Sequence, residues 1–165
     1  MPDVGSTPMP DPLAYFLTWT TYGTWLPGDE RGWVKEGEGF QVPDRRIEHE
    51  ARRKLVEEPF YLDEVQREVI EATIVKHCEI RGWQLFATAC RTAHAHVVVH
   101  APVEPDIVMD QFKAWCTRKL REQAEAAGDG RFLERQRVWT EDGSKRRLYD
   151  TDSLEAAIIY VRDCQ

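Results

Sequence analysis

With 165 residues, of which 42% are hydrophobic and 31% charged, the chain is long enough for one domain with its own core, and its composition is that of a soluble globular protein. The net charge of −7 argues against a general nucleic-acid binder, and no apolar run approaches the roughly 18 residues of a membrane span. No Cys-x-x-Cys pair occurs, so we expect reduced thiols in a cytoplasmic protein. The cysteines are Cys78, Cys90, Cys116 and Cys164.

The first expected elements are a tail, a strand and a loop. Residues 1–12 are rich in proline and lack a signal-peptide pattern, so we expect a flexible tail before a single domain over residues 13–165. Residues 13–24 are rich in aromatic and β-branched side chains, which predicts a strand. The glycines, prolines and charges of residues 25–43 predict a long loop, followed by a short helix over residues 45–56.

The middle of the chain predicts a helix and a hairpin. Residues 62–80 have helical spacing of apolar side chains, and Gly82 ends the helix. Residues 83–92 and 91–100 read as two strands with a tight turn between them, which indicates an antiparallel pair. The apolar residues expected on the buried face of the helix are Val65, Val69, Ala72, Val75 and Ile80.

The last third predicts a second helix over residues 106–127, ended by Gly128, and a third near the chain's end, capped by Asp152. Between them, Asp142-Gly143 is a strong hairpin-turn signal. The order of strand, helix, two strands, helix and strand predicts a ferredoxin-like α+β fold, an antiparallel sheet with helices on one face plus a C-terminal helix. The apolar stripe of the second helix is Val108, Phe112, Trp115, Cys116 and Leu120.

The strand over residues 91–100 carries the first candidate site. Side chains alternate along a strand, so His94 and His96 share one face with Val98 and His100, and the residues facing the opposite way are Ala95, Val97 and Val99. Two imidazoles at this spacing can chelate one divalent ion, and a purely structural histidine pair is the alternative. A zinc hydrolase that adds His100 as the third ligand is a further reading. His49 and His77 have no supporting pattern and are expected at surface or helix positions.

The final helix carries the second candidate. Leu154, Ala157, Ile158 and Val161 form its apolar stripe, and Tyr160 lies at the edge of that stripe. A tyrosine at a rim is commonly a packing residue. Beside a metal ion it can instead act as a nucleophile.

His94-Ala95-His96 followed by three valines resembles the HUH motif, and Ile158-Ile159-Tyr160-Val161 resembles the nucleophile helix of single-tyrosine transposases. Residues 16–32 and 139–146 are similar to a transposase-like branch of these proteins, which includes relatives found beside repeated extragenic palindromes. The resemblance runs from about residue 13 to the end of the chain.

This resemblance implies a metal-dependent endonuclease and strand transferase acting on single-stranded or hairpin DNA. His94 and His96 would hold Mg²⁺ or Mn²⁺, and Tyr160 would attack the scissile phosphate, leaving a 5′-phosphotyrosine bond and a free 3′-hydroxyl. Relatives include monomers and homodimers, and both stay open here. A catalytically inactive or domesticated nucleic-acid-binding module on the same fold is the alternative.

The family commonly places an amide ligand one turn after the tyrosine. Cys164 stands at that position and is a soft ligand poorly suited to Mg²⁺. We therefore favour Gln165, one residue further on, which requires a loosened last helical turn. Asp163 is the third alternative.

Basic and aromatic side chains are the candidates for DNA contact. Lys145, Arg146 and Arg147 precede the tyrosine helix and are the favoured phosphate contacts. A second basic run over residues 45–54 reads equally as solvated surface. Aromatic side chains near the long loop can stack on unpaired bases or pack the loop, and one of them is a rival nucleophile without a helical context. The three aromatic residues are Tyr22, Trp25 and Trp33, and the rival nucleophile is Tyr22.

Overall fold

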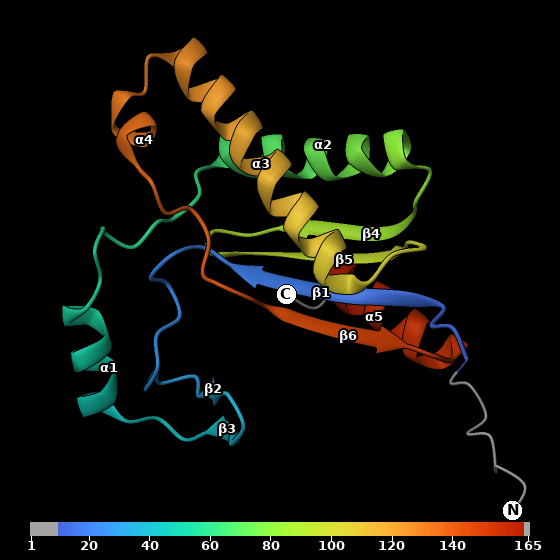
Figure 1. The fold of residues 1–165 in the computed structure, drawn as a ribbon, viewed down its shortest axis with the longest axis horizontal. Coiled ribbons are helices and arrows are strands. Elements are labelled where there is room, and N and C mark those ends of the chain that lie inside the picture. Colours follow the sequence, from blue (N-terminus) through green and yellow to red (C-terminus); the bar gives the residue numbers. More distant parts are fainter. Residues whose placement is uncertain (1–9, 164–165) are drawn as a thin grey trace, which may run out of the picture.

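A four-stranded antiparallel sheet with the strand order β4-β5-β1-β6 forms the centre of the protein (Figure 1). The computed structural model describes residues 10–163, so most of the predicted tail lies outside the described residues. Because β1 and β4 each run antiparallel to β5, they are parallel to each other with β5 between them. This is the split βαβ arrangement of a ferredoxin-like fold, and the predicted α+β class is confirmed. The strands are β1 (Ala14–Thr20), β4 (Gln84–Cys90), β5 (His94–His100) and β6 (Ser144–Leu148).

Helices cover both faces of this sheet. α2 (Glu64–Arg81) and α3 (Pro105–Ala127) pack on one face, and α5 (Thr151–Asp163), which carries Tyr160, lies on the other (Figure 1). Each face has its own hydrophobic cluster, the larger one under α2 and α3 and the smaller one under α5. Within the described residues, no helix is both long and apolar enough to span a membrane.

The two central strands, β1 and β5, contribute side chains to both clusters. Leu17 of β1 and Val97 of β5 are fully buried in the larger cluster. Phe16 and Val98, their neighbours in the chain, belong to the smaller one. The predicted alternation along β5 is therefore confirmed, and its residues in the larger cluster are Ala95, Val97 and Val99.

α2 has the predicted caps but buries a different face. Asp63 and Gln66 form a capping box, and Gly82, in the left-handed conformation with φ 70°, ends the helix. The predicted stripe is wrong: Val65 and Ile80 are 51% and 70% exposed. Apolar residues occur around most of this helix, so spacing alone does not select the buried face. The residues buried are Gln66, Ile70, Ile74, His77 and Cys78, while Val75 and Ala72 are exposed and Val69 is half-buried.

His77 lies on α2, as expected, and is buried against aromatic residues of the larger cluster. Its ring lies edge-on to Trp83, with the centroids 5.2 Å apart, and its Nε2 is 2.8 Å from Oε1 of Gln111. His49 is exposed on α1 (Arg45–Arg53), as expected.

α3 follows its predicted pattern with one exception. Trp115 is 37% exposed beside the stripe, with the Arg118 guanidinium 5.1 Å from its ring centroid. Gly128 ends the helix with φ 70°. The stripe residues that are buried are Val108, Phe112, Cys116 and Leu120.

The segment between β1 and α2 is more regular than the predicted loop. β2 (Trp33–Lys35) and β3 (Gly39–Gln41) form an antiparallel hairpin, and α1 follows with Asp44 as its N-cap. Figure 1 shows this region set to one side of the main sheet. The short helix is confirmed, whereas the predicted long loop contains two three-residue strands whose pattern the glycines and charges hide. A further short helix, α4 (Gly130–Glu134), follows α3.

Asp142-Gly143 does not turn a hairpin, so that prediction is wrong. The chain pairs with β1 or its direct continuation on both sides of this dipeptide: Ser144 pairs with Thr18 of β1, and Trp139 bridges to Thr21, the residue after β1. The residues between these pairs form a bulge, in which Asp142 and Gly143 have φ values of 59° and 153°. The two residues adopt the positive φ values that the hairpin prediction relied on, but they adopt them in a bulge and not in a turn.

The cap of α5 is Asp150, two residues before the predicted Asp152. Its carboxylate accepts hydrogen bonds from the backbone N–H of Ser153 at 2.7 Å and from the Ser153 hydroxyl at 2.9 Å. These bonds hold the pKa of Asp150 below its ordinary value. The predicted stripe packs on the smaller cluster, with Ala157 and Val161 buried and Leu154 and Ile158 partly buried.

We expect Gly143→Ala to lower the free energy of unfolding by about 1–3 kcal/mol, because φ 153° disfavours any side chain. A Cβ there would lie 2.6 Å from the carbonyl oxygen of Thr18. Gly130→Ala is the control, since its added Cβ meets nothing within 4 Å. Urea denaturation of both variants is the measurement, and equal stabilities would contradict the bulge geometry.

Candidate active site

Tyr160 and His96 meet on the α5 face of the sheet. Tyr160 is 45% exposed and lies at the edge of the α5 stripe, as predicted. The centroid of its ring is 5.6 Å from that of His96 and 5.9 Å from that of Phe16, both in edge-to-face contact. Phe16 also lies 5.7 Å from His96. Three rings from β1, β5 and α5 thus form one cluster, which places the predicted nucleophile beside a predicted metal ligand.

His94 stands next to His96 in this cluster. Their ring centroids are 4.6 Å apart, and their positions at i and i+2 on β5 put both side chains on the same face. This separation is compatible with two ligands of one ion.

His96 is held in its neutral form. It is only 6% exposed, and its Nδ1 lies 2.7 Å from Oγ1 of Thr18, its partner on β1. Burial, followed by the charges of His94 and Arg91, lowers the pKa of His96 from 6.5 to about 4. The Thr18 hydroxyl can accept a hydrogen bond from Nδ1–H, which leaves the Nε2 lone pair for a cation.

A cleft of about 420 Å³ opens beside these rings. Its floor comes from the sheet and Tyr160, and its rim from the bulge over residues 140–144 and from the loop after β1. Unlike the floor, the rim carries two carboxylates, those of Glu141 and Asp142. The other side chains that line the cleft include Phe16, Thr18, Trp25 and His96.

The rim of the cleft is fixed by Lys113 of α3. Its ammonium donates hydrogen bonds to the carbonyl oxygens of Thr140 at 3.1 Å and Asp142 at 2.5 Å. Burial lowers the pKa of Lys113 below its ordinary value. The helix on one face of the sheet therefore holds the edge of a cleft that opens on the other face.

The third metal ligand is not found within the described part of the chain. Among residues 10–163, no three His, Cys, Asp or Glu side chains come together as a metal-binding group. Asp163 and His100 do not form such a group with His94 and His96, and their roles as ligands stay predictions. Gln165 and Cys164 lie outside the described residues, so their roles remain predictions.

The cysteines described are poor metal ligands. Cys78, Cys90 and Cys116 are unpaired and buried, as expected for reduced thiols. Burial raises the pKa of Cys78 to about 11 and that of Cys90 to about 12, and it also raises the pKa of Cys116. They are therefore protonated near neutral pH.

The three basic residues of β6 do not share one face. Arg146 pairs with Phe16 and so projects to the Tyr160 side. Lys145 and Arg147 project to the α2–α3 side, where they form ion pairs of 2.7 Å with Asp106 and Glu104. The structure thus brings only Arg146 to the face that carries Tyr160.

The aromatic residues after β1 are engaged within the loop. The Tyr22 hydroxyl accepts a hydrogen bond from the Val56 N–H. The indole N–H of Trp33 donates to the Val42 carbonyl, and that of Trp25 to the Gly32 carbonyl. Trp25 is still 41% exposed, and it lines the cleft. Contacts within the protein thus account for the positions of Tyr22 and Trp33, whereas the ring of Trp25 is also accessible from the cleft.

Sequence reasoning missed Thr18, Phe16 and Lys113. The first two alternate with buried residues along β1, a signal that places them on the histidine face once β1 and β5 are paired. Lys113 has no such signal, because its partners are backbone carbonyls of a distant bulge.

No protein-family model matches the chain, and no curated protein matches it. Among solved structures it is similar to a REP-associated tyrosine transposase bound to a REP hairpin, with a TM-score of 0.49 and 13% sequence identity. The match covers 94% of this chain and 70% of that one. This likeness is distant.

We expect the metal-free protein to lose stability as the pH falls from 6.5 toward 4. The unfolded chain binds a proton at His96 in this window and the folded chain does not, so a contribution of up to about 3 kcal/mol that is complete above pH 6.5 disappears. Urea denaturation across this range measures it. His96→Gln should flatten the pH dependence, whereas His49→Gln should keep it, and identical slopes for both variants would contradict the burial of a neutral His96.

Proposed function

We propose that this chain is a metal-dependent single-stranded DNA endonuclease and strand transferase in which Tyr160 is the nucleophile. The observation that supports it most is the contact between the rings of Tyr160 and His96 beside an open cleft. The resemblance of the histidine and tyrosine motifs to single-tyrosine transposases supplies the reaction class.

In the proposed reaction, the Tyr160 hydroxyl oxygen bonds to the phosphorus of a backbone phosphodiester, and the bond from phosphorus to the 3′ oxygen breaks. The phenol gives up its proton and the departing oxygen takes one up, which leaves a 5′-phosphotyrosine link and a free 3′-hydroxyl. Attack by a 3′-hydroxyl on that link then releases Tyr160. Cutting and joining exchange one phosphodiester for another, so they need no external energy source.

His94 and His96 would hold the cation, Mg²⁺ or Mn²⁺. A cation bound there stabilises the negative charge that develops on the phosphate oxygens. The two residues fit this role because their rings are adjacent and His96 is neutral. Mg²⁺ and Mn²⁺ prefer oxygen ligands, so oxygen donors would have to complete the set that the two imidazoles begin. We assign the amide oxygen of Gln165 to one of these positions.

Single-stranded or hairpin DNA is the proposed substrate. Tyr160 is exposed and lies at a cleft rather than in a closed cavity, so a strand can reach its hydroxyl. Arg146 is the basic side chain of β6 on this face and is proposed to contact a phosphate. Lys145 and Arg147 lie on the opposite face of the sheet, in ion pairs with Asp106 and Glu104. We therefore propose that they stabilise the fold and do not contact DNA.

A catalytically inactive nucleic-acid-binding module is the second candidate. The observation in its favour is that residues 10–163 bring together no group of three His, Cys, Asp or Glu side chains that could hold a metal ion. It predicts DNA binding that is unaffected by EDTA, with no cleavage of any strand.

Tyr160→Phe should reduce the covalent adduct formed with single-stranded DNA and Mn²⁺ by more than about a hundredfold, because it removes the attacking oxygen. Denaturing gel electrophoresis of the protein–DNA adduct is the measurement. Tyr149→Phe is the matched control, since Tyr149 is similarly exposed at 42% but precedes α5. Tyr22→Phe tests the rival nucleophile. An adduct that persists in Tyr160→Phe would contradict the assignment of Tyr160 as the nucleophile.

His94→Ala should weaken Mn²⁺ binding at least about tenfold, because it leaves one imidazole ligand in place of two. Calorimetric titration of the purified protein measures this. His100→Ala removes a histidine from the same face at the other end of β5 and should leave the affinity unchanged. Equal losses in both variants would point to a different ligand set.

A further inference from the structure

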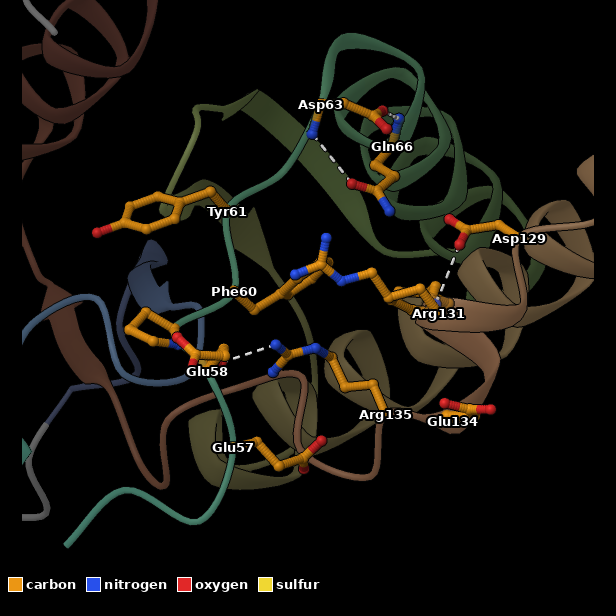
Figure 2. A pocket seen from close by; sticks show the side chains of 12 residues that line it. Glu57, Glu58, Phe60, Tyr61, Asp63, Gln66, Asp129, Arg131, Glu134 and Arg135 are labelled. Carbon is orange, nitrogen blue, oxygen red and sulfur yellow. Dashed lines mark hydrogen bonds between the residues drawn. The ribbon is translucent and has the colours of Figure 1, made fainter. Parts of the chain in front are cut away.

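A second and larger hollow, of about 590 Å³, lies between the segment that joins α1 to α2 and the region of α4 (Figure 2). It shares no residue with the cleft beside Tyr160. A hollow of this volume is in the range of sites that bind small organic molecules. Its side chains divide into groups already engaged within the fold and groups that are not.

Three carboxylates of the hollow are engaged with the backbone. Asp63 accepts a hydrogen bond from the N–H of Gln66 at 2.8 Å, and Asp129 accepts one from the N–H of Phe132 at 3.1 Å. Glu57 accepts one from the N–H of Arg137 at 2.7 Å. These hydrogen bonds fix the three carboxylates as parts of the walls.

One of the two guanidiniums is also engaged. Arg135 donates to the carbonyl oxygen of Glu58 at 2.7 Å and lies 4.9 Å from the ring centroid of Phe60 (Figure 2). It closes one side of the hollow by joining the α4 region to the segment before α2.

The other guanidinium is available. Arg131 is exposed, extends into the hollow (Figure 2), and forms no hydrogen bond or ion pair with residues 10–163. Its five N–H groups can therefore serve a ligand.

Gln66 adds a second set of donors from a buried position. The residue is 6% exposed, and its Oε1 accepts a hydrogen bond from the N–H of Asp63 at 3.0 Å. Figure 2 shows the amide nitrogen directed into the hollow, where it has no hydrogen-bond partner among the described residues. The two N–H groups of this amide can therefore donate to water or to a ligand in the hollow.

The charges of the hollow disfavour a phosphate. Five carboxylates and two guanidiniums line it, which leaves three net negative charges. The side chains of Glu58 and Glu134 accept no hydrogen bond from residues 10–163, so they can accept one from a ligand. The fitting ligand is therefore an uncharged group that presents both acceptors and donors.

We propose that this hollow binds an unpaired guanine base. Guanine offers O6 and N7 to an arginine fork, and its N1–H and N2–H groups suit a carboxylate. Adenine fits less well, because a glutamine pairs with adenine through both its oxygen and its nitrogen, and the Gln66 oxygen already accepts a hydrogen bond from the Asp63 N–H. The base can belong to a nucleic-acid strand or to a free nucleoside. The strand source rests on the proposed function, whereas the pocket chemistry does not.

The first test is calorimetric titration of the full chain with guanosine and with adenosine. Guanosine should bind at least about tenfold more tightly, and Arg131→Ala should weaken guanosine binding by a similar factor. Gln66→Glu should weaken it too, because glutamate keeps the capping box but replaces the N–H donors. Arg81→Ala, which removes the same charge at the other end of α2, should leave the affinity unchanged.

The second test compares hairpin oligonucleotides that carry one unpaired guanine or an abasic site, with EDTA present so that binding is measured without cleavage. Tighter binding of the guanine hairpin, lost in Arg131→Ala, assigns the base to a strand. Guanosine selectivity without that preference assigns it to a free nucleoside. No selectivity in either test, or equal affinities for Arg131→Ala and Arg81→Ala, overturns the proposal. If the unmodified protein forms no covalent DNA adduct at Tyr160 but still binds guanosine more tightly than adenosine, only the proposed function is overturned.

Discussion

Burial of both faces of β1 and β5 is the constraint on which the rest of the structure depends. Successive side chains of these strands enter different clusters, so their pairing cannot slip by one residue without exchanging the two faces. Such a slip would turn His96 into the larger cluster and bring Val97 to the cleft. The aliphatic residues under α2 and α3 therefore fix which way the histidines point.

The candidate site depends on this constraint in a second way. Thr18 stands opposite His96 only in the observed register, and it supplies the contact to Nδ1. α5 completes the site by packing Ala157 and Val161 on the same face and by starting at the Asp150 cap. The position of Tyr160 therefore follows from packing that lies mostly outside the cleft.

The sequence predicts the sheet, its class and the two motifs of the candidate site, because these depend on local periodicity and on the order of elements. It fails where the outcome depends on tertiary contacts. Apolar residues around most of α2 left its buried face undecided, and the partner of the chain around Asp142-Gly143 is a strand far away in sequence. The same reason explains why Lys145 and Arg147, which precede the tyrosine helix, turn out to be paired with α3 and the residue before it. Register, and not composition, decides which basic side chain faces the cleft.

Lys113 links the two sides of the molecule. Its ammonium is bound to carbonyl oxygens at the cleft rim, while its helix belongs to the opposite layer. A displacement of α3 along the sheet would therefore change the width of the cleft without touching Tyr160 or the histidines. The contact needs both a long cationic side chain at position 113 and a bulge that turns two backbone carbonyls toward it.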